Sequence, residues 1–131
     1  MLRSACIKTH PSGLDEVRIS VMSRHTLRDG VTPDPEIDLE SFDLHWPELG
    51  PAPKVIGGYY RGEIKWPEFK DLYLQRLYES QSVDKLGELA NLARACNVMV
   101  LCIEAESDFC HRGVLLEHFS LHNPEIEVEV N

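Results

Sequence analysis

The sequence predicts an α/β domain in which a short, mainly parallel sheet is flanked by helices. Residues 98–103 (Val-Met-Val-Leu-Cys-Ile) form an unbroken apolar run of the kind found in strands that are buried on both faces. Helical patterns at 66–79 and 83–95 precede this run, and another at 110–121 follows it. Strands that alternate with helices imply right-handed crossovers and parallel pairing.

The first half of the chain predicts less regular structure than the second. The first strand is expected at 17–23, where apolar residues alternate with more polar ones. The stretch 29–53 contains five of the eight prolines, which interrupt regular structure, and we expect one short helix within it at 34–42. A further short helix, limited by glycines, is expected at 53–62.

Stronger helical signals begin at Trp66. Pro67 suits the first turn of a helix, and Glu68 is favourable at the positive end of the helix dipole. The helix at 83–95 carries an apolar stripe at helical spacing. The strict alternation at 126–130 predicts a last strand, which gives a sheet of three or four strands.

Composition limits the possible classes of function. A length of 131 residues suits a single domain spanning 1–131, and a net charge of −9 argues against a general nucleic-acid binder. No run of 18 apolar residues and no signal peptide is visible, so we expect a cytoplasmic protein with no membrane span. In that compartment the four cysteines are expected to be buried, catalytic or metal-bound rather than paired in disulfides.

The chemistry-bearing residues cluster around one predicted strand–loop–helix segment. Ligands bind open α/β sheets beyond the carboxyl ends of the strands, where helix N-termini present free N–H groups. Cys102 ends the central strand, and the residues that follow the first strand would arrive at the same edge. The candidate site therefore comprises Arg24, His25, Cys102, Glu104, Cys110, His111 and Arg112.

Three motifs resemble the DUF488 family. They are Cys102-Ile-Glu104 followed by Cys-His-Arg at 110–112, the Trp-Pro-Glu-Leu-Gly-Pro-Ala-Pro run at 46–53, and Trp-Pro-Glu-Phe-Lys-Asp-Leu-Tyr at 66–73. The resemblance covers about residues 18–119 and implies an α/β fold with a mainly parallel sheet. The family name denotes unknown function, so the resemblance implies site positions and no reaction or cofactor. The proline-rich motif ends in Pro-Ala-Pro where a serine is expected, which weakens any role for a hydroxyl there.

One interpretation of the segment is thiol chemistry at Cys110. A helix N-terminus and the neighbouring His111 and Arg112 favour the thiolate, whereas the acidic side chains of the loop 104–109 oppose it. In this interpretation His111 is the acid–base partner, Arg112 anchors an anion, and Cys102 acts as a resolving thiol.

A second interpretation is a metal site. Cys102, Cys110 and His111 are ligand types that suit zinc, with Glu104 or another histidine completing the set. The eight-residue step between the two cysteines is not a standard zinc spacing, and no second paired motif follows it.

The remaining interpretations involve no covalent chemistry. Arg24, Arg112 and helix-end N–H groups would hold a small anionic ligand such as a nucleotide or carboxylate. In a purely structural role, Cys102 packs in the core and Arg112 pairs with Glu104. A different class of function is a non-catalytic interaction module that uses the proline-rich segment 29–53 to bind a protein partner.

Overall fold

The computed structural model describes residues 1–9, 15–104 and 110–129, and their central feature is a parallel sheet. Five strands pair in the order β3-β2-β4-β1-β5, and every pairing is parallel. The α/β class with a mainly parallel sheet is confirmed. The strands are β1 (Leu2–Cys6), β2 (Val17–Ser20), β3 (Leu44–His45), β4 (Val98–Cys102) and β5 (Val128–Glu129).

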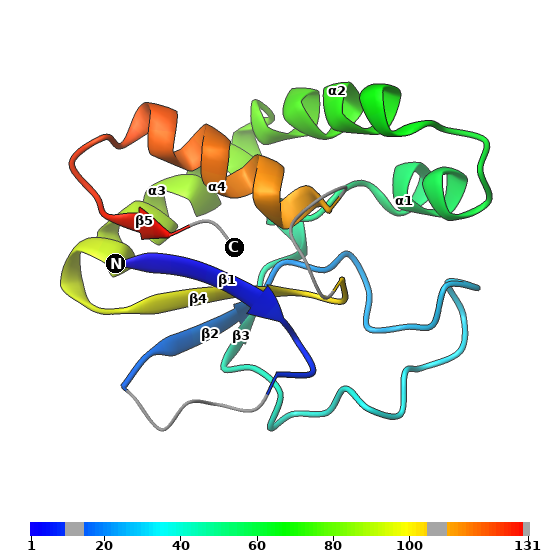
Figure 1. The fold of residues 1–131 in the computed structure, drawn as a ribbon, viewed down its shortest axis with the longest axis horizontal. Coiled ribbons are helices and arrows are strands. Elements are labelled where there is room, and N and C mark those ends of the chain that lie inside the picture. Colours follow the sequence, from blue (N-terminus) through cyan, green and yellow to red (C-terminus); the bar gives the residue numbers. More distant parts are fainter. Residues whose placement is uncertain (10–14, 105–109, 130–131) are drawn as a thin grey trace.

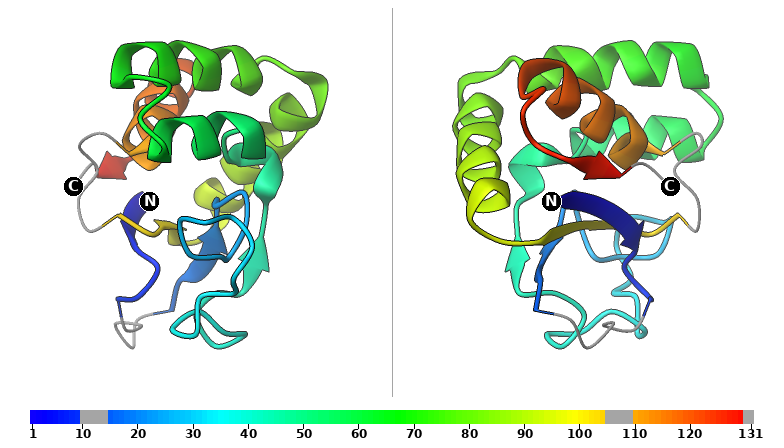
Figure 2. Two further views of the ribbon diagram at one scale, coloured as in Figure 1. Left: turned by 90° about the vertical axis from the view of Figure 1, so that its right-hand side faces the viewer. Right: turned by 60° about the vertical axis from the view of Figure 1, so that its left-hand side comes forward.

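Helices gather on one side of this sheet. Figures 1 and 2 show α1, α2 and α4 above the strands, while the long segment between β2 and β3 loops beyond the carboxyl ends of the strands. None of the helices in the described ranges has the length and apolar character needed to cross a bilayer. The helices are α1 (Pro53–Tyr60), α2 (Trp66–Leu77), α3 (Ser80–Ala95) and α4 (His111–His122), with a 3₁₀ turn, η1, at Pro47–Leu49.

Strand β4 lies at the centre of the sheet, and all five of its residues are buried. Val98 and Val100 join the apolar cluster formed with α2, α3 and α4. Met99 and Leu101 belong to a second cluster, to which the proline-rich segment 29–53 contributes partly buried side chains. Burial on both faces is what an unbroken apolar run predicts, and the prediction for 98–103 is confirmed.

The expected helix at 34–42 is wrong. The Asp34 carboxylate accepts the backbone N–H of Glu36 at 2.9 Å, and the Asp38 carboxylate accepts that of Glu40 at 2.8 Å. These side chains capture N–H groups two residues further on and stabilise turns in place of helical hydrogen bonds. The segment is a series of turns that ends in β3.

The sheet has five strands where the sequence predicted three or four, and several element boundaries also differ from the prediction. The first strand of the sheet is β1 at Leu2–Cys6, a segment in which we expected no strand. The expected strand at 17–23 stops at Ser20, because the chain turns away there toward the proline-rich segment. Helix α3 begins at Ser80 rather than at 83.

Candidate functional site

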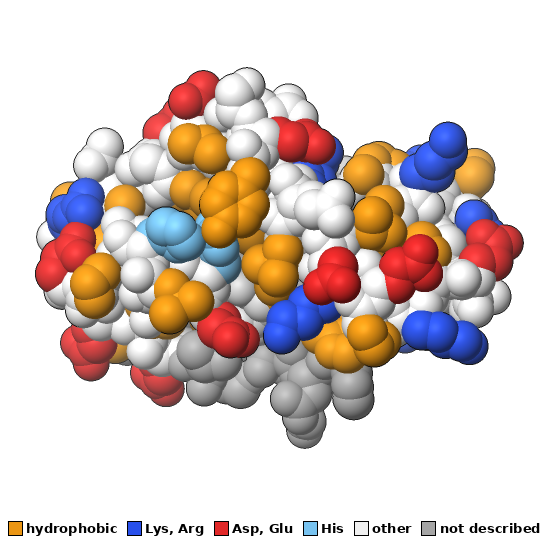
Figure 3. Space-filling model, turned by 90° about the horizontal axis from the view of Figure 1, so that it is seen from above, with side chains coloured by type: hydrophobic (Ala, Val, Ile, Leu, Met, Phe, Trp, Pro, Cys, Tyr) orange, Lys and Arg blue, Asp and Glu red, His pale blue; other side chains and the backbone are white. Residues whose placement is uncertain are grey.

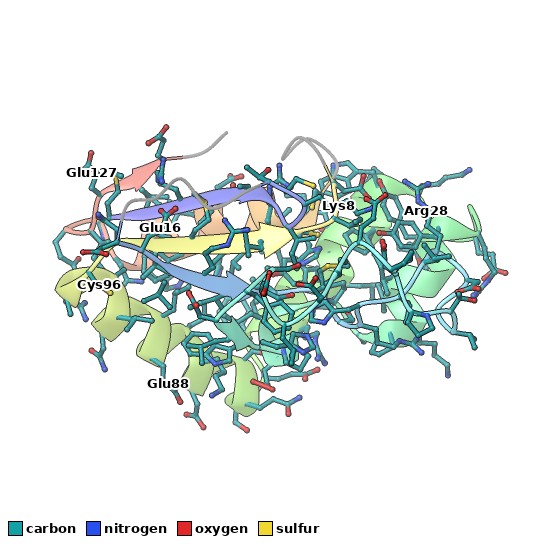
Figure 4. All side chains as sticks on the ribbon, turned by 90° about the horizontal axis from the view of Figure 1, so that it is seen from below. Lys8, Glu16, Arg28, Glu88, Cys96 and Glu127 are labelled. Atoms are coloured by element: carbon teal, nitrogen blue, oxygen red, sulfur yellow. The ribbon has the colours of Figure 1, made fainter. Side chains whose placement is uncertain are left out.

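A pocket of about 240 Å³ opens at the carboxyl edge of the sheet. Its walls come from the segment that follows β2 and from the first turns of α1, and its base includes the end of β4 and the start of α4. Figure 4 shows Lys8 and Arg28 at this end of the molecule, while Cys96 lies at the opposite end of the strands. The pocket is therefore at the edge where the sequence predicted a site. The lining residues used below are Lys8, Arg24, Arg28, Asp34, Tyr60, Cys102 and His111.

Cys102 and His111 meet at the base of this pocket. The Cys102 Sγ lies 3.6 Å from His111 Nδ1, and His111 Nε2 lies 2.8 Å from the backbone oxygen of Val21. A carbonyl oxygen can only accept a hydrogen bond. In the neutral ring Nε2 therefore carries the proton and donates a hydrogen bond to the Val21 backbone oxygen. Nδ1 is left unprotonated and able to accept the Cys102 thiol proton. The ring is also held edge-on by Tyr73, with 5.3 Å between ring centroids.

The two buried thiols differ in their electrostatics. Burial raises the pKa of Cys102, but hydrogen bonds from the Cys110 thiol and from the backbone N–H groups of Glu104 and Ile103, together with the Arg112 charge, lower the pKa below its usual value. The pKa of Cys110 is raised well above its usual range, first because Cys110 hydrogen-bonds to Cys102 and second because it is buried. The hydrogen bond from the Cys110 thiol thus favours an anion at Cys102 over one at Cys110.

Sequence predicted Cys110 as the reactive group, and that role stays a prediction. Cys110 is the N-cap of α4, so it does lie at a helix N-terminus. However, the described lining of the pocket includes Cys102 and not Cys110. His111 also interacts with Cys110, and the ligand atoms of Cys102, Cys110 and His111 all lie within 4.8 Å of one another. These three side chains are close enough to share one metal ion.

Arg112 occupies a structural position. Its side chain is fully buried, and its guanidinium donates a hydrogen bond to the backbone oxygen of Glu104. The contact closes the loop between β4 and α4 through the main chain of Glu104, where sequence reasoning considered a pairing with its carboxylate. Arg112 is not among the described residues that line the pocket.

The mouth of the pocket carries the exposed charges. The Glu104 carboxylate accepts a hydrogen bond from the Tyr60 hydroxyl at 3.3 Å and lies 3.8 Å from the Arg28 guanidinium. Arg28 also stacks over the Tyr60 ring at 4.9 Å from its centroid. Arg24 lies in the same wall and donates to the backbone oxygen of Gly30 at 3.0 Å. Sequence reasoning singled out Arg24 and missed Arg28, although a second arginine four residues later was a visible signal.

His25 lies elsewhere. Its Nε2 is 2.7 Å from the Ser20 hydroxyl, and its ring packs on His45 and Phe42 with centroid distances of 4.2 and 4.7 Å. Burial and the neighbouring His45 lower the pKa of His25 to about 4. The described pocket lining includes its neighbours Arg24 and Thr26 but not His25.

A second groove, of about 220 Å³, lies on the helical surface between α2, α3 and α4. It contains His118 and His122, whose ring centroids are 4.4 Å apart, with Tyr78 edge-on to both. Figure 3 shows histidine side chains among hydrophobic ones on this face. The groove is far along α4 from Cys110, because it is formed at the opposite end of the helix.

Comparison with known protein families gives a match over most of the chain. The family model described as the active DUF488-N3 subclade matches residues 2–122. No curated protein and no solved structure is significantly similar to the chain. The match covers all three motifs on which the resemblance rested, the Cys102–Arg112 segment included. The chain belongs to the DUF488-N3a family.

Proposed function

We propose that this protein binds a small anionic molecule in the pocket and that Cys102 reacts covalently with it. The observation that carries the proposal is the alignment of Cys102 Sγ, His111 and the Val21 carbonyl at the pocket base, with contacts of 3.6 and 2.8 Å. A nucleophile within reach of a base, which is itself oriented by a third group, is the general arrangement for nucleophilic catalysis.

Each group in this arrangement has one role. His111 Nδ1 takes the thiol proton of Cys102 while Nε2 keeps its hydrogen bond to Val21. The sulfur electron pair forms a bond to an electrophilic carbon of the ligand, and the displaced electron pair moves to the electronegative atom bound to that carbon. Nδ1 then returns the proton to that atom, so charge and atoms balance without an oxidant or reductant.

The charge of the lining supports an anionic ligand. The described lining contains three cationic side chains, Lys8, Arg24 and Arg28, and one acid, Asp34, and the carboxylates of Glu36 and Glu104 lie beside two of these cations. Lys8 is already paired with Asp34 at 3.3 Å and with Glu36 at 2.9 Å, so the two arginines are the cations that a ligand would meet. The contact between Arg28 and Glu104 is long and exposed, so a ligand carboxylate or phosphate can replace it at little cost.

Alkylation by two reagents of different charge tests both halves of the proposal. Neutral iodoacetamide and anionic iodoacetate are applied to reduced, metal-free protein, and labelling of each cysteine is followed by peptide mass spectrometry. We expect Cys102 to label faster than the more exposed Cys96, and His111→Gln to slow Cys102 by at least about tenfold. Faster labelling of Cys110 than of Cys102 would mean that Cys110, the thiol that the sequence favoured, is the reactive one. Slow labelling of both cysteines would refute thiol chemistry.

The charge of the pocket is read from the ratio of the two rates. Arg24→Gln with Arg28→Gln should lower the iodoacetate rate at Cys102 and leave the iodoacetamide rate nearly unchanged. Arg94→Gln, which removes an exposed arginine paired with Glu125, is the matched control and should change neither rate. Equal effects on both reagents would contradict an anion site.

A second candidate function is a protein-interaction module that uses the proline-rich segment 29–53. It is favoured by two large apolar side chains in that segment, Val31 and Leu39, which are 81% and 87% exposed. Limited proteolysis distinguishes the two roles. A segment that is cut readily in the isolated protein supports partner binding, whereas a protected one supports its role as a wall of the pocket.

A further inference from the structure

We infer that Cys102, Cys110 and His111 form a zinc-type metal site with three protein ligands and an open fourth position facing the pocket. The inference does not depend on the covalent chemistry proposed above. Because the metal and an attacking nucleophile would use the same Cys102 sulfur, the bound metal would switch that chemistry off.

Distances among the ligand atoms already approach those of a tetrahedral site. With a Zn–S bond of about 2.3 Å and a Zn–N bond of about 2.0–2.1 Å, tetrahedral geometry places sulfur and nitrogen about 3.6 Å apart. The Cys102 Sγ and His111 Nδ1 are 3.6 Å apart. The same geometry places two sulfurs about 3.8 Å apart, and all three ligand atoms lie within 4.8 Å of one another.

The outer contacts of His111 suit a metal ligand. A histidine that binds a metal usually donates its other ring N–H to a carbonyl or carboxylate, which fixes the tautomer and the ring orientation. His111 Nε2 donates to the Val21 oxygen at 2.8 Å, so Nδ1 is the nitrogen presented to the two sulfurs. The edge-on ring of Tyr73 limits rotation further. The imidazole is therefore oriented before any metal arrives.

The types of the three ligands indicate which metal ion the site would bind. Two thiols and one imidazole, all buried, are soft and borderline ligands that favour zinc over magnesium or calcium, which prefer oxygen. Cys102 and His111 line the pocket, so the fourth position opens into it. A site with three protein ligands and one open position is the catalytic type of zinc site, in which a water or a ligand anion completes the shell.

Cobalt titration of the reduced full chain tests the inference. We expect one Co²⁺ per chain, with a sulfur-to-cobalt charge-transfer band and the intense visible bands of tetrahedral cobalt, both lost when Zn²⁺ is added. Cys110→Ser and His111→Gln should each weaken binding at least tenfold. Cys96→Ser, which removes a thiol outside the site, should bind cobalt like the unaltered protein. Circular dichroism establishes that each variant is folded.

The histidine pair in the second groove provides a further control. His118 and His122 could bind cobalt, but without sulfur they would give no charge-transfer band, and His118→Gln with His122→Gln should leave the band unchanged. Absence of the band in the unaltered protein, or cobalt binding by Cys110→Ser as tight as that of the unaltered protein, would overturn the inference.

Labelling separates this inference from the proposed function. Zn²⁺ should protect Cys102 from iodoacetamide, and a chelator should restore labelling. In Cys110→Ser, labelling of Cys102 should persist but lose its protection by Zn²⁺. Rapid labelling that Zn²⁺ never affects would refute the metal site and leave the thiol chemistry standing. A cobalt–sulfur band with no labelling of the metal-free protein would refute the thiol chemistry alone.

Discussion

Acid should destabilise this protein through His25. The imidazole is half-buried against His45 and Phe42, and its pKa is lowered to about 4. In the unfolded chain a histidine titrates near pH 6.5. As the pH falls below about 6.5, the unfolded chain therefore binds a proton before the folded one does. Stability from the neutral imidazole is complete above that pH and is lost progressively as the pH falls toward 4.

The magnitude follows from the difference between the two pKa values. A gap of about 2.5 units at about 1.36 kcal/mol per unit sets an upper limit of about 3.4 kcal/mol. His25 is only partly buried, so solvent screens part of this penalty, and we reduce the expectation to about 1.5–2 kcal/mol. A loss of this size is a substantial part of the stability of a small domain.

Urea denaturation at a series of pH values measures the effect. The free energy of unfolding of the unaltered protein should fall by about 1.5–2 kcal/mol more than that of His25→Gln between about pH 7 and pH 4. Carboxylates titrate in the same range but contribute equally to both proteins, so the difference isolates His25. His122→Gln, which removes an exposed imidazole, should follow the unaltered protein. Parallel curves for the unaltered protein and His25→Gln would refute the reasoning.

Two substitutions near the site test the packing that positions it. Gly50→Ala would place a Cβ atom 2.7 Å from the Val21 backbone oxygen; we expect a loss of about 1–3 kcal/mol in urea denaturation and slower alkylation of Cys102, because Val21 orients His111. An unchanged urea midpoint and an unchanged alkylation rate of Cys102 would show that the backbone shifts to accept the new Cβ atom without loss of stability. Tyr73→Phe removes a buried 2.6 Å hydrogen bond to a backbone oxygen and should cost about 1–2 kcal/mol by the same assay, whereas a neutral result would mean that water replaces the hydroxyl.

The parts of the fold that sequence predicts are those with strong local signals. The apolar run at 98–103 favours a doubly buried strand, and β4 occupies 98–102 of it, while the proline and glutamate at 67–68 suit the start of α2. Strand β1 has only one large aliphatic side chain, Leu2, and it is a strand because β4 and β5 pair with it on either side. The two-residue strand β3 depends in the same way on its partner β2.

Sequence predicted which edge of the sheet brings the candidate residues together, while their roles stay predictions. Parallel strand order brings Cys102 and His111 together, and the sequence pattern indicated that edge. Which thiol is the favoured anion depends on the N–H groups and charges around each sulfur, and sequence does not show which acceptor a guanidinium will reach. Arg112 follows a helix start, as anion-binding arginines do, yet it is enclosed by the main chain at Glu104.

The strand order has a consequence for how the chain acquires its structure. Strand β1 pairs with β4 in a register that joins Leu2 to Val98, and β1 then accepts β5 on its other side. Both of these partners follow β1 in sequence, so β1 stays unpaired until the segment up to β4 has been synthesised. Contacts so distant in sequence slow folding, and an unpaired strand is open to association with other chains in the interval. The pocket base at Cys102 and His111 therefore cannot form before both β4 and the start of α4 have been synthesised.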